Sequence, residues 1–270
     1  MDLDPTNATL VAREDVTDIL SIVRVRPDSG TVPPFVPGQF IRLGLLRPPR
    51  AGDSAHRPLS PRRRIRLTRR AYSMASPPSI TEWMEFFVVR IERGELTPRL
   101  WAINPGGRLW MDDKAKGEFR IDLAPPGKDL VMVATSTGVA PFMSMLRAYR
   151  GQNRWRRLVV INGVRRARDL GYQAELEAVA REDPSVVYIP VASRELEDSP
   201  WRGQRGRVQA VLEPQKYQEL VGAPLDPQEC HVFLCGNPGM IGSVAPELAA
   251  RGFVVHSRET RGNVHFERYW

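Results

Sequence analysis

The chain has 270 residues, 42% of them hydrophobic and 26% charged, with a formal net charge of +8. This length and composition are typical of a globular protein with one large domain or two medium ones. The sequence contains no apolar run of the roughly 20 residues that cross a membrane, and its polar start, MDLDPTNATL, does not resemble a signal peptide. Its two cysteines are too few for a disulfide framework or an iron–sulfur cluster. We therefore expect a cytoplasmic protein.

The first half of the sequence predicts β-structure. Short apolar or alternating runs, separated by turns rich in proline and glycine, are typical of the antiparallel strands of a barrel or sandwich. The expected strands are DILSIVRVRP (18–27), GQFIRLGLL (38–46), RAYS (70–73), EFFVVRIE (85–92) and GRLWM (107–111).

An arginine-rich stretch interrupts this half. Residues 47–70 contain nine arginines and one acid, Asp53, so their charge of nine minus one equals the whole net charge of +8. Their prolines predict an exposed, irregular loop. Such a loop attracts an acidic protein, a nucleic acid or phosphate, or it is a solvated surface loop. No aromatic residues alternate with the arginines, which argues against a module that binds single-stranded nucleic acid.

The second half changes to an alternation of strands and helices, which predicts a doubly wound parallel α/β sheet. We place the linker at residues 124–128 and the domains at 1–125 and 126–270. The expected strands are 128–135, 157–163, 185–193, 231–237 and 253–259, and the expected helices are 137–150, 171–183, 207–212 and 238–252.

The segment RAYS combines a cation, a flat ring and a hydroxyl. Residues two apart in a strand point to the same face, so Arg70 and Tyr72 present a guanidinium and a phenol ring side by side. A guanidinium suits a pyrophosphate and an aromatic ring stacks on a flat heterocycle, while the Ser73 hydroxyl can bond a ring nitrogen. The ligand that fits is a flavin dinucleotide.

The chain resembles the bacterial ferredoxin/flavodoxin–NADP(+) reductase family from Val36 to its final residue. The resemblance is carried by seven segments in the family's order: RAYS, GELTPRL, TSTGVAPF, VRRARDLGY, ASRE, LCGNPGMI and ERYW. It implies an antiparallel FAD-binding β-barrel followed by an NADP-binding α/β domain with an aromatic tail. It also implies hydride transfer from NADPH to flavin N5 and single-electron transfer to a ferredoxin or flavodoxin.

The resemblance implies which residues bind FAD. Arg70 contacts the pyrophosphate, Tyr72 packs on the isoalloxazine and Ser73 lies near N5. Thr97 and the amides around it hold the pyrophosphate, since a helix N-terminus favours anions; a plain N-cap is a compatible alternative for Thr97. The remaining residues expected to contact FAD from this half are Ala71, Val88, Val89, Arg90, Gly94 and Leu96.

The resemblance also assigns the transfer site and the tail. Ser73, Thr137, Cys235 and Glu267 line the site of hydride transfer, where Cys235 is a wall residue and Glu267 helps to handle protons. Tyr269 covers the isoalloxazine and Trp270 lies near the adenine, although simple hydrophobic docking of the tail is the alternative. Ser136 departs from the glycine that is common in the family.

The nucleotide preference follows from residues expected near a 2′-phosphate, where an arginine is the usual ligand. Ser193, Arg194 and Arg207 bind that phosphate by resemblance, and Arg165 contacts the nucleotide as well. Glu195 is adjacent, and an acid at this place is more typical of an NAD enzyme. The preferred cofactor is nevertheless NADP(H).

The expected partner is a small acidic electron carrier, steered by the arginine-rich loop, and we expect a monomer without nucleic-acid or membrane partners. No metal is expected because the histidines show no ligand spacing. Alternative functions are an NAD(P)H reductase component of an oxygenase, an NADH-preferring diaphorase, or a subunit of an electron-bifurcating complex. The histidines are His56, His231, His256 and His265.

Overall fold

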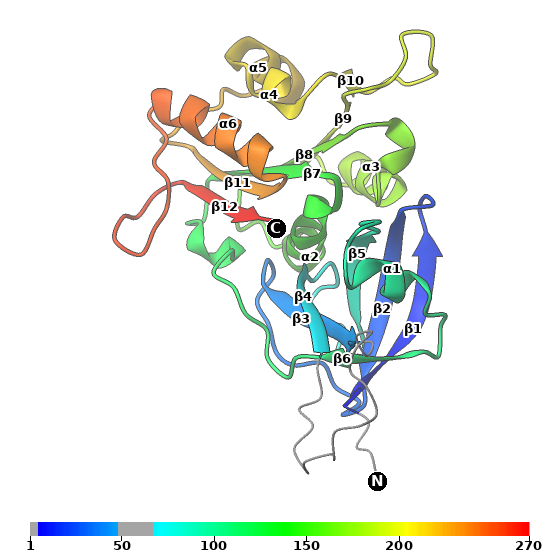
Figure 1. The fold of residues 1–270 in the computed structure, drawn as a ribbon. Helices are drawn as coiled ribbons and strands as arrows, with labels where there is room; N and C mark the ends of the chain where they lie inside the picture. The colour runs from blue at the N-terminus through cyan, green and yellow to red at the C-terminus, as the bar shows by residue number, and fades with distance from the viewer. Residues whose placement is uncertain (1–4, 48–66, 270) are drawn as a thin grey trace, which may run out of the picture.

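The computed structural model describes residues 5–47 and 67–269. Trp270 and most of the arginine-rich stretch lie outside the described residues. Within them the chain forms two six-stranded sheets, one in each half of the sequence, and Figure 1 shows the two sheets as separate layers that meet near the C-terminus. The prediction of antiparallel β-structure followed by a parallel α/β sheet is confirmed.

The first sheet is antiparallel and has the strand order β4-β3-β6-β1-β2-β5. It curves so that its two edges approach each other, since the amide of Ala75, just after β4, donates to the Glu85 carbonyl of β5 at 2.8 Å. The strand β1 was not predicted. The elements are β1 (Ala8–Asp15), β2 (Leu20–Pro27), β3 (Phe40–Leu46), β4 (Leu67–Ser73), β5 (Met84–Val89), α1 (Thr97–Trp101) and β6 (Arg108–Met111).

The second sheet is parallel throughout, with the order β10-β9-β8-β7-β11-β12. Its central strands are apolar because helices cover both faces: α2 and α3 pack on one face, and α4, α5 and α6 on the other. The elements are β7 (Asp129–Thr135), α2 (Ala140–Tyr149), β8 (Arg157–Val164), α3 (Gln173–Glu182), β9 (Val186–Ala192), β10 (Gln204–Arg205), α4 (Val208–Leu212), α5 (Pro214–Val221), β11 (Cys230–Gly236), α6 (Pro238–Ala250) and β12 (Val264–Arg268), with short 3-10 helices at η1 (Ile121–Leu123), η2 (Ser136–Val139) and η3 (Ala167–Asp169).

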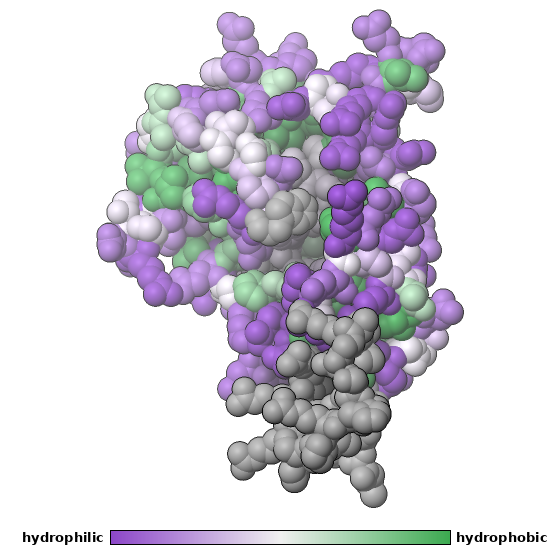
Figure 2. Space-filling model, in the orientation of Figure 1, coloured by the Kyte–Doolittle hydropathy of each residue, from purple (hydrophilic) through white to green (hydrophobic). Residues whose placement is uncertain are grey.

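The prediction of the last strand was wrong. The segment 253–259 does not form a strand, and β12 pairs with the edge of β11 in its place. The segment meets β12 only through an isolated parallel bridge between Val255 and Val264, and Val254 and Val255 are 47% and 36% exposed. Figure 2 shows a hydrophobic patch at the left of the molecule, over the segment between α6 and β12. The strand β10 and the helix α5 were also not predicted, and the domain boundary at residues 125 and 126, between β6 and β7, stays a prediction.

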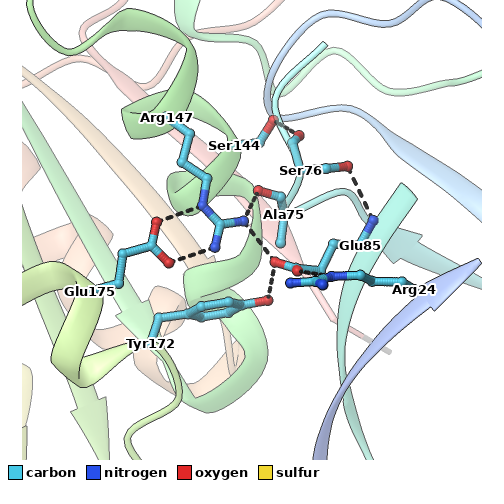
Figure 3. A network of polar contacts seen from close by, with 8 residues as sticks. All are labelled: Arg24, Ala75, Ser76, Glu85, Ser144, Arg147, Tyr172 and Glu175. Carbon is cyan, nitrogen blue, oxygen red and sulfur yellow. Dashed lines mark hydrogen bonds and ion pairs between the residues drawn. The ribbon is translucent and has the colours of Figure 1, made fainter. Parts of the chain in front are cut away.

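A buried carboxylate joins the two halves of the molecule (Figure 3). Glu85 on β5 has a side chain only 2% exposed. It accepts a hydrogen bond from Nη1 of Arg147 on α2 at 2.7 Å, from Nε of Arg24 at 2.9 Å and from the Tyr172 hydroxyl at 3.1 Å. Arg147 also donates to both carboxylate oxygens of Glu175 at 2.7 and 2.6 Å. Two arginines therefore bind one carboxylate inside the contact between the halves.

The protonation of Glu85 follows from these neighbours. Burial alone would raise the pKa of Glu85, but the guanidiniums of Arg147 and Arg24 outweigh it and hold the pKa below its ordinary value. A second contact reinforces the first, because the Ser144 hydroxyl of α2 donates to the Ser76 carbonyl of the barrel half at 2.7 Å. The ionised carboxylate is thus the stable form of Glu85.

We predict that Glu85→Gln lowers the free energy of unfolding by about 3–5 kcal/mol, because it removes the buried carboxylate that pairs with Arg24 and Arg147. The contribution of Glu85 should be complete above its unfolded-state pKa of 4.5 and should be lost as the pH falls through the lower folded-state value. Urea unfolding at pH 7 measures the difference. The control is Glu182→Gln, whose exposed pair with Arg150 spans 3.8 Å and should change stability by about 1 kcal/mol or less. Equal effects of the two variants would contradict the prediction.

Candidate functional site

A cavity of about 710 Å³ lies where the barrel meets the end of the chain. Its walls come from β4, from β5 and the segment after it, from the turn that follows β7, and from β12 with the residue beyond it. Eleven of the residues predicted as functional line it together: Arg70, Ala71, Tyr72, Ser73, Val89, Gly94, Leu96, Thr97, Thr137, Glu267 and Tyr269.

The barrel side of the cavity presents the segment predicted to bind a flavin. Arg70 is exposed and Tyr72 half-buried, and the Tyr72 ring meets Phe86 edge to face at 6.3 Å between centroids. Pairing of β3 with β4 sets Phe40 opposite Ser73, which brings a second ring into the lining. A cation, aromatic rings and a hydroxyl therefore share one wall.

The C-terminal side meets this wall through a chain of hydroxyl groups. The Tyr269 hydroxyl donates to Ser73 Oγ at 3.2 Å and lies 3.4 Å from the Thr137 carbonyl, and Ser73 Oγ donates to Oε2 of Glu267 at 2.9 Å. Parallel pairing of β12 with β11 holds this end of the chain, and the Tyr269 amide donates to the Gly236 carbonyl at 3.1 Å. The hydroxyl chain ends on the Glu267 carboxyl.

The ionisable groups here are shifted by burial. Burial raises the pKa of Glu267 to about 7, although the hydrogen bond from Ser73 opposes the rise. Burial likewise raises the pKa of Cys235 well above its ordinary value, so the thiol stays protonated. Cys235 is fully buried at the end of β11 and does not line the cavity. A carboxyl that titrates near neutrality therefore lies beside an unreactive thiol.

The β5–α1 side of the cavity is held by Thr97. Its Oγ1 accepts from the Ile91 amide at 2.9 Å, which fixes the segment between β5 and α1. The side chain of Val88 is 1% exposed in the barrel core, and neither Val88 nor Arg90 lines the cavity.

Five lining residues were not predicted as functional. Phe87 and Ile91 lie two residues before and after Val89, so the alternation of faces along a strand could have predicted both as lining residues. Phe40 lines the cavity because β3 pairs with β4, and no local sequence pattern predicts that pairing. The five are Phe40, Phe87, Ile91, Glu95 and Arg268.

The turn after β7 has two backbone constraints. Gly138 cannot carry a side chain, because a Cβ there would lie 2.3 Å from the Cys235 carbonyl oxygen. Ser136 has a φ of +51°, in the left-handed region that favours glycine. The structure therefore places a strained serine in the turn that a nucleotide would approach.

The residues predicted to read a 2′-phosphate gather away from the cavity, at the carboxyl ends of β8 and β9. Arg165, Ser193, Arg194 and Arg207 are all exposed, and the Arg194 amide donates to the Arg165 carbonyl at 2.8 Å. Ligands of doubly wound sheets bind at this edge. The structure brings these four together, apart from the flavin-side residues.

The neighbouring acid, Glu195, is already engaged. Its Oε1 accepts from the Ala167 amide at 2.5 Å, and this hydrogen bond holds the pKa of Glu195 below its ordinary value. One oxygen of the carboxylate therefore braces the segment after β8.

The cavity lining fits a flavin dinucleotide. Tyr72 and Tyr269 offer two rings, and the exposed guanidinium of Arg70 offers a partner for a pyrophosphate. A volume of about 710 Å³ lies within the range of cofactor sites. In the part of the chain that the structure describes, no group of three or more His, Cys, Asp or Glu side chains could hold a metal ion, and no helix is long and apolar enough to cross a membrane.

Comparisons with known proteins agree with this arrangement. Residues 132–245 match the family described as an oxidoreductase NAD-binding domain. The chain is 31% identical over 239 residues to the flavodoxin/ferredoxin–NADP reductase of Escherichia coli (strain K12), with 88% of each chain covered. It is 34% identical over 268 residues to ferredoxin–NADP reductase B of Sorangium cellulosum, with 98% of each covered. A crystal structure of a ferredoxin NADP+ reductase from Neisseria gonorrhoeae with bound FAD and NADP matches with a TM-score of 0.81 and 26% identity, covering 97% of this chain and 98% of that chain.

We predict that Ser136→Gly raises the free energy of unfolding by about 1 kcal/mol, because it removes the cost of a left-handed non-glycine residue. Thermal unfolding measures the change. The control is Ser79→Gly, at an exposed position without a positive φ, which should lose about 0.5–1 kcal/mol through the greater entropy of the unfolded chain. A loss of stability in both variants would show that the φ of Ser136 carries no strain.

Proposed function

The chain belongs to the flavodoxin/ferredoxin–NADP reductase family, and from this we propose that it passes electrons between NADPH and a small one-electron carrier, a ferredoxin or a flavodoxin. As a member of this family it is an FAD-dependent oxidoreductase. The observation that supports the proposal most is the single cavity in which the Arg70–Ser73 segment faces Glu267 and Tyr269. These residues come from different halves of the chain and are almost 200 residues apart in the sequence.

In the proposed holoenzyme the cavity holds FAD. Arg70 and the amides at the start of α1 bind the pyrophosphate, because both offer donors to an anion. Tyr72 and Tyr269 cover the isoalloxazine, and Trp270 is proposed to lie near the adenine. When bound, FAD supplies an acceptor for the NADPH hydride at N5 and a donor of single electrons.

The chain's own residues orient these reactants and handle a proton. The Ser73 hydroxyl can donate to a ring nitrogen or pass a proton to Glu267, which it contacts at 2.9 Å. Thr137 lines the same cavity, and Cys235 lies behind it as a neutral, polarisable wall. Tyr269 occupies the space between Ser73 and Thr137, so nicotinamide would reach the site only after the tyrosine moves.

The proposed nucleotide is NADP(H). Arg165, Arg194 and Arg207 offer guanidiniums, and Ser193 a hydroxyl, at the edge where the adenosine end would lie. Charge-assisted bonds from arginine to phosphate are stronger than neutral ones. An acidic carrier remains the proposed partner, because the exposed Arg268 at the cavity would attract it.

We predict that the purified protein is yellow and that NADPH bleaches its flavin absorption anaerobically about tenfold or more faster than NADH, since an arginine–phosphate contact contributes about 1.5–3 kcal/mol. Stopped-flow spectra with each nucleotide measure the two rates. Equal rates would favour the NADH-preferring diaphorase. A colourless protein that takes up no added FAD would end the proposal.

We predict that Arg194→Ala raises the KM for NADPH by about ten- to a hundredfold and leaves the KM for NADH unchanged, because it removes one charge-assisted bond to the 2′-phosphate. Steady-state reduction of an artificial acceptor measures both constants. The control is Arg181→Ala on α3, an exposed arginine outside the proposed site. A parallel rise for both nucleotides in Arg194→Ala would assign this arginine to another part of the nucleotide.

A further inference from the structure

The loop between β9 and β10 connects two of the predicted phosphate ligands. Residues 193–203 leave the sheet at the end of β9 and return to it at β10, and Figure 1 shows them as a yellow loop that projects beyond these strands. Ser193 and Arg194 begin the loop, whereas Arg207 follows β10 at the N-cap of α4. The path of the loop therefore sets the distance between Arg194 and Arg207.

Both ends of the loop are fixed to the sheet. The amide and the hydroxyl of Ser193 donate to the Val164 carbonyl of β8 at 3.0 and 3.1 Å. At the other end the Gly206 amide donates to the Ala192 carbonyl of β9 at 3.1 Å. These bonds do not reach the middle of the loop, where Leu196 is 61% exposed. The middle needs a support of its own to keep one conformation.

Arg205 on β10 supplies this support. Its side chain is exposed and turns back onto the loop, where Nη1 donates to the Leu196 carbonyl at 2.8 Å. Its Nη2 donates to Ser199 Oγ at 3.2 Å and lies 3.4 Å from the Trp201 carbonyl. One guanidinium therefore contacts three residues of the loop.

The indole of Trp201 forms the base of the loop. It packs against a small buried cluster at the ends of β8 and β9, and its Nε1 donates to the Gln204 carbonyl at 3.1 Å. Gly203 lies directly against the ring, since a Cβ there would be 2.1 Å from an indole carbon. The loop consequently has an apolar base under it and the Arg205 guanidinium across it.

We propose, on the basis of the function proposed above, that Arg205 is a positioning residue that fixes Arg194 and Arg207 at the separation required by the 2′-phosphate of NADPH. Leu196 follows Arg194 by two residues, and Arg205 precedes Arg207 by two. The bond between Arg205 and the Leu196 carbonyl thus ties together the surroundings of both ligands. Because the loop is ordered before the nucleotide arrives, binding does not have to order it.

The test compares Arg205→Lys with Arg205→Ala in steady-state reduction of an artificial acceptor. Lysine keeps the charge but lacks the planar fork that reaches several acceptors at once. Both variants should therefore raise the KM for NADPH alike, by about three- to tenfold, and leave kcat and the KM for NADH unchanged. A wild-type KM in Arg205→Lys, with a rise only in Arg205→Ala, would show that the charge acts on the phosphate directly and would overturn the proposal.

The matched control is Arg202→Ala, which removes the same charge from the same loop. Arg202 is exposed, and its guanidinium takes no part in the bonds that Arg205 makes. Its KM for NADPH should stay within about twofold of the wild-type value, because loss of one exposed charge has little effect by itself. An equal rise in Arg202→Ala and Arg205→Ala would reduce the effect to net charge and contradict the proposal.

A second measurement needs no nucleotide. Glu197 is exposed in the middle of the loop, and a protease that cuts after glutamate cleaves there faster when the loop opens locally. We expect cleavage after Glu197, followed by mass spectrometry, to be about fivefold faster in Arg205→Lys and unchanged in Arg202→Ala. Cleavage at the wild-type rate in Arg205→Lys would show that Arg205 does not order the loop.

The two measurements also separate this proposal from the proposed function. A wild-type protein whose flavin is not reduced by NADPH would refute the proposed function, whatever the protease shows. Normal reduction of the wild-type protein, together with a wild-type KM and wild-type cleavage in Arg205→Lys, would refute only the role of Arg205.

Discussion

The burial of the Glu85 carboxylate at the contact between the two halves is the constraint on which the rest of the structure depends. A carboxylate with 2% of its side chain exposed stays ionised only if cations compensate it. One of these cations, Arg147, belongs to α2, and the other, Arg24, to the barrel. The pairing therefore requires both halves to be folded and in register.

This constraint also sets the geometry of the candidate site. The helix α2 begins directly after the turn Ser136–Val139, while β5 leads from Glu85 to Phe87 and Val89, which line the cavity. The ion pair between Glu85 and Arg147 consequently holds the turn Ser136–Val139 close to the cavity wall that β5 forms. The parallel pairing of β12 with β11 then carries the Glu267 carboxyl to Ser73, 194 residues away in the sequence.

Much of the architecture could be predicted from local pattern, because strands and helices impose periods of two and 3.6 residues on the sequence. The apolar runs at β7, β8, β9 and β11 predict buried parallel strands. The alternation of side-chain direction along a strand predicts that Arg70 and Tyr72 of RAYS lie on one face. The same reasoning failed for residues 253–259. The segment begins with Phe253, Val254 and Val255, which suit a strand, but the edge of β11 pairs with β12, and Val255 meets only Val264 of β12 in an isolated bridge.

The sequence by itself determined the two-part fold, the order of the motifs and the resemblance that points to FAD and NADP(H), since each of these depends on residues close together in the chain. Only the tertiary structure decided that Glu195 is bound to the Ala167 amide, that Phe40 lies opposite Ser73 and that Glu267 accepts a hydrogen bond from Ser73. These facts depend on groups that are remote in sequence and meet only after the sheets have formed. The periodicity of apolar residues within a segment does not predict these contacts, because pairing and packing between distant segments depend on how the whole chain buries its apolar surface.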